Sequence, residues 1–268
     1  MIRYCRKCVE PDTRPDCVFD EDSVCFPCRY REKFEDIDWV SRHREIKEIA
    51  EWGRSKSTSG YDCIIGVSGG KDSLRQSLFA RDELGLKPLL ISCAYPPEQQ
   101  TDRGAANLAN LSKLGFDVIT VRPAPQIYKK LVRWGFTEFG NWCKSTEMAL
   151  YASVPRLAVA YNIPLYFLGE NPALSWGSAG GSLDGDANRI KYNHTLQGGD
   201  IKPLLADDVT ESDVFWYLYP SDADMAHAEL RIVYLGYYIR DFNDFSNGRI
   251  AIQHGLQVRE GLDADPEQ

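Results

Sequence analysis

The chain reads Gly66-Val67-Ser68-Gly69-Gly70-Lys71-Asp72-Ser73 over residues 66–73. An apolar run at residues 61–67 leads into this stretch, and a segment of helical character follows at residues 74–80. This order predicts a buried strand, a glycine-rich turn and the start of a helix. Free backbone N–H groups and the helix dipole face an anion at such a turn, so the stretch predicts a phosphate-binding loop.

The loop differs from a Walker A motif. That motif places four residues between its first glycine and the Gly-Lys pair, and a Ser or Thr follows the lysine. Here three residues intervene, and Asp72 follows Lys71. Because an aspartate is repelled by phosphates, we expect Asp72 to face Mg²⁺ or the helix N-terminus.

The residue types at the other loop positions also suit phosphate binding. Gly69 and Gly70 let the backbone approach phosphates without an intervening Cβ, and Lys71 supplies a fixed positive charge. Ser68 and Ser73 offer hydroxyl donors. The alternative is a glycine turn that joins strand to helix and binds nothing.

Strand and helix patterns alternate beyond the loop. Strands are predicted at residues 61–67, 88–94, 117–121 and 165–168, and helices at residues 102–114, 124–136 and 144–160. The βαβ alternation predicts an α/β fold, a doubly wound parallel sheet with helices on both faces.

Ligands of open parallel sheets bind beyond the carboxyl ends of the strands. The second strand ends near Ser92 and Ala94, where the backbone can hold adenine. The fourth ends at Gly169, followed by Glu170 and Asn171, whose short oxygen-bearing side chains are candidates for Mg²⁺ or phosphate contacts. An ordinary turn before Pro172 is an equally good interpretation of Glu170 and Asn171.

The cysteines near the start of the chain predict a metal site. Cys5-x2-Cys8 and Cys25-x2-Cys28 are separated by sixteen residues, a spacing typical of a four-thiolate Zn²⁺ site. Some 30 residues bury too little apolar surface to fold alone, so the metal would supply the folding energy. We therefore predict a structural zinc ribbon; a redox or iron–sulfur set is the alternative.

The composition limits the remaining possibilities. The 268 residues suffice for one large domain and a small module, and we expect a zinc ribbon at residues 1–33, a linking helix at 34–60 and an α/β domain at 61–268. The net charge of −8 argues against a nucleic-acid partner. No signal peptide or membrane-spanning run is evident, so we expect a cytoplasmic protein with no membrane partner.

The string Ser-Gly-Gly-Lys-Asp-Ser at residues 68–73 resembles the PP-loop of N-type ATP pyrophosphatases. The resemblance implies that ATP is bound with Mg²⁺ and is cleaved between its α and β phosphates. It implies catalytic roles for Lys71 and Asp72, and a nucleotide site formed by residues 68–73 with the strand ends at Ser92, Ala94 and residues 169–171. Lys202, in a Lys-Pro-Leu segment similar to that of several PP-loop enzymes, becomes a candidate phosphate contact.

Most of the chain resembles the N-acetyl sugar amidotransferases of bacterial surface-polysaccharide synthesis. Besides the PP-loop, the matching strings are Cys-x2-Cys-Val-x-Pro-Asp-Thr-Arg-Pro at residues 5–15, Asn141-Trp142-Cys143-Lys144, Gly169-Glu170-Asn171-Pro172 and residues 235–242. Such enzymes convert the acetamido group of a nucleotide-linked N-acetyl sugar to an acetamidino group, in lipopolysaccharide O-antigen or flagellin-glycan synthesis. Cys143 thereby becomes a candidate catalytic residue, with a buried thiol beside Trp142 as the alternative.

The resemblance also bears on the source of ammonia and on the end of the chain. No glutaminase motif is recognisable, so the implied partner is a separate glutaminase and ammonia-channel pair resembling the HisH and HisF proteins of histidine synthesis. Family members usually continue with a further helical segment, whereas residues 261–268 have linker composition. We therefore expect a chain shortened at its C-terminus.

ATP-dependent tRNA 2-thiolation is the alternative activity, because a second family joins a cysteine ribbon to this loop. That chemistry requires reactive cysteines near the loop and a basic surface for tRNA. Outside the ribbon the chain has only Cys63, Cys93 and Cys143, and no further Cys-x-x-Cys pair is present.

Overall fold

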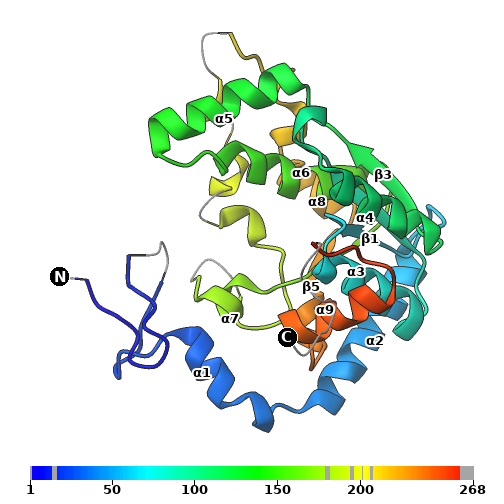
Figure 1. Cartoon of the computed structure of the whole chain (residues 1–268). Helices are drawn as coiled ribbons and strands as arrows, with labels where there is room; N and C mark the ends of the chain where they lie inside the picture. Colours follow the sequence, from blue (N-terminus) through cyan, green and yellow to red (C-terminus); the bar gives the residue numbers. More distant parts are fainter. Residues whose placement is uncertain are drawn as a thin grey trace.

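The computed structural model describes residues 2–13, 17–178, 182–193, 196–200, 202–205 and 208–259. Within them lies a five-stranded, all-parallel sheet of order β3-β2-β1-β4-β5. Figure 1 labels β1, β3 and β5 among the surrounding helices. The strands are β1 (Cys63–Gly66), β2 (Pro88–Cys93), β3 (Asp117–Val121), β4 (Leu165–Leu168) and β5 (Arg231–Tyr234). The predicted α/β class with a parallel sheet is confirmed.

Helices cover both faces of the sheet because side chains alternate along each strand. Ile65 and Phe167 pack into a core with α2 (Trp39–Lys56), α3 (Lys71–Leu78), α4 (Asp102–Lys113) and α9 (Asp244–Gln253). Ile64 and Tyr166 face the opposite core, formed with α5 (Pro125–Phe139) and α6 (Lys144–Ala160). α8 (Asp222–His227) contacts α6.

The strand order creates a switch point beside β1. The chain moves outward from β1 to β2 and β3, and then returns to place β4 and β5 on the other side of β1. The segments that leave β1 and β4 therefore start from adjacent strand ends. In open α/β sheets this crevice is where ligands bind.

Several sequence predictions need correction. The aromatic and aliphatic composition of residues 231–240 predicts core without indicating a strand, yet Arg231–Tyr234 forms β5 beside β4. The Thr-Glu-Ser-Asp run and the apolar residues after it predict a capped helix over residues 210–218. This prediction is wrong, because only a 3₁₀ turn, η7 (Phe215–Tyr217), forms there. There Asp213 accepts hydrogen bonds from the backbone N–H and hydroxyl of Thr210, which closes a local turn instead of a helix.

The predicted linking helix is divided. A 3₁₀ turn, η1 (Phe34–Asp36), precedes α2, and the Asp38 side chain caps α2 by accepting from the Ser41 backbone N–H. The ending at residues 261–268 lies outside the described residues. No helix in the described part of the chain has the length and apolarity needed to cross a bilayer.

The cysteine-rich segment packs against the sheet domain through two short helices. α1 (Phe26–Glu32) contacts α7 (Pro172–Trp176), which follows the end of β4. An isolated antiparallel bridge joins Cys17 to Ser178. Gly177 adopts a φ of 78°, and a Cβ there would lie 3.3 Å from Pro27. The cysteine-rich segment therefore packs against α7, which follows the end of β4 at the switch point.

Candidate functional site

The turn after β1 has the backbone of an anion-binding loop. Gly69 has a φ of 78°, and a Cβ there would lie 3.1 Å from the backbone nitrogen of Leu108. Only glycine meets both demands without strain. The turn ends at Gly70, the N-cap of α3. The first N–H groups of a helix have no acceptor within the helix, so those of α3 are suited to bind an anion at the turn.

Serine hydroxyls fix the shape of this turn. Ser68 Oγ accepts from the backbone N–H of Gly70 at 3.2 Å, and Ser73 Oγ donates to the Gly70 carbonyl at 3.1 Å. The Ser68 N–H donates to Ser73 Oγ at 3.4 Å. In the described state both hydroxyls therefore bond within the loop.

Lys71 and Asp72 form a charged pair at the start of α3. Lys71 Nζ lies 2.8 Å from Asp72 Oδ2 and 3.0 Å from Asp244 Oδ1 of α9. Burial would lower the pKa of Lys71, but the two carboxylates outweigh it and raise that pKa above its usual value. Lys71 therefore carries a positive charge at neutral pH.

The end of β4 adds a third carboxylate. Burial, and then the charge of Asp72, raises the pKa of Glu170, while Lys71 partly offsets the rise. The Gly236 N–H donates to the Gly169 carbonyl at 3.0 Å, which holds the segment that leaves β4 against the one that leaves β5. Glu170, after β4, thus lies close enough to Asp72 and Lys71, after β1, for their charges to act on it.

Asn171 has a structural role within the same segment. Its Oδ1 accepts from the Ala173 N–H and caps α7, and its Nδ2 donates to the Ser182 and Asp184 carbonyls. The side chain is buried. Asn171 therefore positions the Glu170 turn, and its amide is already engaged by the protein.

A cavity of about 280 Å³ opens beside the loop. Its lining includes three predicted residues, Ser68, Ser92 and Ala94. The Ala94 N–H is donated to the Val121 carbonyl, so a base at this strand end would meet the Ala94 carbonyl oxygen instead. The lining also includes residues that sequence analysis did not assign to the site, among them Cys93, Tyr95, Tyr128, Thr146 and Leu150.

Cys143 lies at the N-cap of α6, one turn before Thr146 of the cavity wall. Burial, and then the Glu147 charge, raises the pKa of its thiol. A thiol with a raised pKa is protonated at neutral pH and is a poor nucleophile. The geometry places Cys143 near the cavity without activating it.

We expect Cys143 to react slowly with iodoacetamide at pH 8. Its reactivity should rise with pH through a midpoint above the ordinary thiol value of 9.0, because the thiolate is the reacting form. Peptide mapping of alkylation against pH measures this midpoint. Glu147→Gln should lower it, because a repelling charge is removed. A midpoint below 9.0 in the unmodified chain would contradict the expected environment.

Lys202 is exposed in a 3₁₀ turn, η6 (Lys202–Leu204), and its backbone N–H donates to Asp200. Among the described residues, no ion pair or hydrogen bond joins it to residues 68–73. Its proposed phosphate contact stays a prediction.

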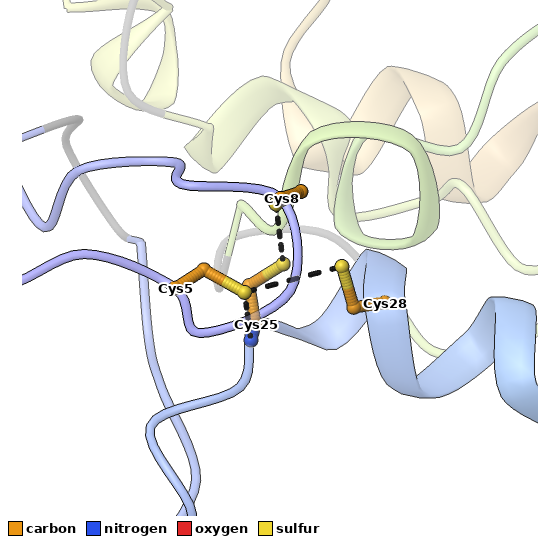
Figure 2. Close-up of side chains that lie close together, drawn as sticks. All are labelled: Cys5, Cys8, Cys25 and Cys28. Atoms are coloured by element: carbon orange, nitrogen blue, oxygen red, sulfur yellow. Dashed lines mark hydrogen bonds between the residues drawn. The ribbon is translucent and has the colours of Figure 1, made fainter.

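Four thiols converge near the N-terminus. The ligand atoms of Cys5, Cys8, Cys25 and Cys28 all lie within 4.8 Å of one another (Figure 2). The Cys5–Cys28 and Cys8–Cys25 sulfur pairs are 3.9 and 3.6 Å apart. Tetrahedral Zn²⁺ with Zn–S bonds of about 2.3 Å requires sulfur separations of roughly 3.8 Å. The predicted cluster is thus assembled, and its dimensions fit zinc.

Backbone groups support thiolates in this cluster. Burial raises the pKa of Cys5, but hydrogen bonds from the N–H groups of Cys25, Cys8 and Lys7 outweigh it and lower that pKa to about 6. The Cys25 N–H lies 3.4 Å from Cys5 Sγ. Burial raises the pKa of Cys28 to about 11. The cluster thus offers one ready thiolate, and a bound cation would favour the others.

No protein-family model matches the chain, and a search of curated proteins finds no match.

Sequence analysis missed Asp244 and Asn247, which approach the loop from α9. Asn247 Nδ2 donates to Asp72 Oδ1 at 2.9 Å. The available signal was local: Asn243 precedes a helical segment as a good N-cap, and Asp244 and Asn247 are three residues apart on one helix face. That α9 would meet α3 depends on tertiary packing and had no local signal.

Proposed function

We propose that the chain is an ATP-dependent, AMP-forming amidotransferase that converts the acetamido group of a nucleotide-linked N-acetyl sugar to an acetamidino group. The observation that carries the proposal is the glycine turn at the β1–β4 switch point, with its lysine and carboxylates. The resemblance of residues 5–15, 141–144, 169–172 and 235–242 to sugar amidotransferases gives the substrate class.

The loop is suited to hold the two outer phosphates of ATP. The glycine turn leads directly into the N-terminus of α3, and the positive charge of Lys71 lies at the first residue of that helix. The cavity lined by Ser68, Ser92 and Ala94 lies beside the turn and suits the nucleoside. This arrangement leaves the inner phosphate between loop and cavity, where an acceptor can reach it.

Asp72 and Glu170 are the residues that would hold Mg²⁺. Three carboxylates, those of Asp72, Glu170 and Asp244, lie near one lysine here, so a triphosphate would bind more weakly without a divalent cation. Bound Mg²⁺ would neutralise the phosphate oxygens. The raised pKa of Glu170 fits a carboxyl that lacks a full counter-charge.

The proposed reaction has two steps. The acetamido oxygen attacks the α phosphorus, an O–P bond forms, and the bond to the β-phosphate oxygen breaks so that pyrophosphate stays with the loop. Ammonia then adds to the activated carbon through its lone pair, and AMP leaves with the former acetamido oxygen. Loss of one proton gives the amidinium cation, and loss of a second gives the neutral amidine. The residues of the loop contribute positioning and charge stabilisation.

We propose that a separate glutaminase and ammonia-channel pair supplies the ammonia. ATP-dependent tRNA 2-thiolation is the alternative activity. Burial raises the pKa of Cys93 to about 11, and the pKa of Cys143 is also raised. Neither thiol is an activated sulfur carrier by that measure. Sulfur transfer would require both to be deprotonated by a ligand or partner.

Mass spectrometry tests the proposal. The chain is incubated with Mg²⁺, α-labelled ATP, ammonium chloride and a panel of UDP- and CMP-linked N-acetyl sugars. We expect AMP, pyrophosphate and a sugar product lighter than its substrate by the difference between an oxygen atom and an NH group. Labelled ADP in place of AMP would overturn the proposal, and a thiolated tRNA formed with sulfide would favour the alternative.

A further inference from the structure

α9 brings two polar side chains to the loop from a distant part of the sequence. Among described helix pairs, α9 and α3 make the most extensive contact. Asp244 and Asn247 lie on the face of α9 that meets α3, and the Lys71 stem passes the same helix, because a Cβ on Gly248 would lie 4.0 Å from Lys71 Cδ. The start of α9 is fixed by Asn243, whose side chain accepts from the Ser246 N–H.

The two oxygens of Asp72 have separate partners. Lys71 Nζ binds Oδ2 at 2.8 Å, and Asn247 Nδ2 donates to Oδ1 at 2.9 Å. A carboxylate only accepts hydrogen bonds, so the amide NH₂ of Asn247 must face Asp72. Asn247 is 1% exposed, and its Oδ1 is buried without a hydrogen-bond partner. Leaving the Asn247 oxygen buried and unpaired costs free energy, which the hydrogen bond to Asp72 helps to offset.

Asp244 acts on Lys71 in a different way. Its side chain is 88% exposed, so it can leave Lys71 at little cost in packing. While Asp244 is paired with Lys71, the ammonium group is not available to an incoming phosphate, and the Asp244 carboxylate adds a negative charge at the loop. Glu170 and Asp72 face the same lysine.

We propose that α9 adjusts the loop with two side chains of opposite effect: Asn247 positions the Asp72 carboxylate for nucleotide binding, and Asp244 competes with the nucleotide phosphates for Lys71. This inference rests on the proposed function, since it assigns both residues to an ATP site. Without Asn247, Asp72 loses the donor that holds Oδ1 and is free to turn toward the phosphates. Without the Asp244 charge, Lys71 is available to them.

Calorimetric titration of the full chain with α,β-methylene-ATP tests both roles. With Mg²⁺ present, Asn247→Leu should weaken binding by roughly tenfold to hundredfold, as for the loss of a hydrogen bond to a charged group. With EDTA and no metal, Asp244→Asn should bind about twofold to fivefold more tightly than the unmodified chain, as for an exposed ion pair.

Ile250→Ala is the matched control, because Ile250 lies on the same helix and its apolar side chain packs against the core. It should lower the unfolding temperature and leave the dissociation constant within about twofold. The inference is overturned if Ile250→Ala weakens binding as much as Asn247→Leu, if Asn247→Leu binds normally, or if Asp244→Asn does not tighten metal-free binding. An unmodified chain that binds no analogue overturns the proposed function, and this inference falls with it.

Discussion

Lys71→Ala is expected to lower AMP formation by roughly a hundredfold to a thousandfold, the usual loss when one preorganised group that stabilises developing charge is removed. Lys71 is the cation that the structure places at the turn, held between Asp72 and Asp244. Its loss would leave three carboxylates facing the phosphates with no lysine between them. Release of α-labelled AMP, followed in a single turnover, measures the effect.

The pH dependence of this residue has a defined sign. The carboxylates raise the pKa of Lys71, so its charge persists through and above neutral pH and is lost only on the alkaline side of its ordinary value of 10.5. Deprotonation of Lys71 should therefore not lower the activity between pH 7 and pH 9. Lys87→Ala is the control, because Lys87 precedes β2 at the opposite end of the sheet. A Lys71→Ala variant with normal AMP release would contradict the assignment.

Loss of zinc is expected to unfold the cysteine-rich segment. Cys28→Ser removes one of four ligands, and structural Zn²⁺ sites of this kind contribute about 10 kcal/mol or more of binding free energy to folding. The segment has few other sources of stability, since its own buried core is Cys5, Val24 and Cys25. Zinc content by mass spectrometry and hydrogen exchange over residues 17–33 measure the two losses.

The loss should reach the sheet domain as well. α1 packs against α7, and α7 starts at Asn171, which positions the Glu170 turn. Hydrogen exchange in α7 should therefore rise with zinc loss. Cys17→Ser is the control, because Cys17 lies in the same segment but outside the four-cysteine cluster. This variant should keep the metal. Full zinc retention in Cys28→Ser would contradict a four-thiolate site.

The strong local patterns of the sequence predicted most of the sheet. Residues 117–121 and 165–168 combine β-branched or aromatic residues with turn signals, and both strands form over the predicted bounds. β5 was missed because Arg231–Tyr234 runs into further apolar residues without a turn between them. The cysteine cluster was predictable because metal-ligand spacing is itself a sequence signal.

The candidate site could be predicted only in part. The turn at residues 68–73 encodes its own shape, since Gly69 and the two serines act within a few residues of one another. Tyr95, Tyr128 and Thr146 come together at the cavity only after three elements pack. Asn171 shows a further limit: a short polar side chain at a strand end suits a ligand or a helix cap equally, and only the fold shows that it caps α7.

The hydrogen bond between Asp72 and Asn247 spans 175 positions of the chain. At translation rates of about 5–20 residues per second, the ribosome needs roughly 10 to 35 s to supply the second partner after the first. A nascent polypeptide therefore carries the glycine turn long before the helix that completes its surroundings. The surroundings of the proposed nucleotide site would therefore be completed only after α9 has been synthesised.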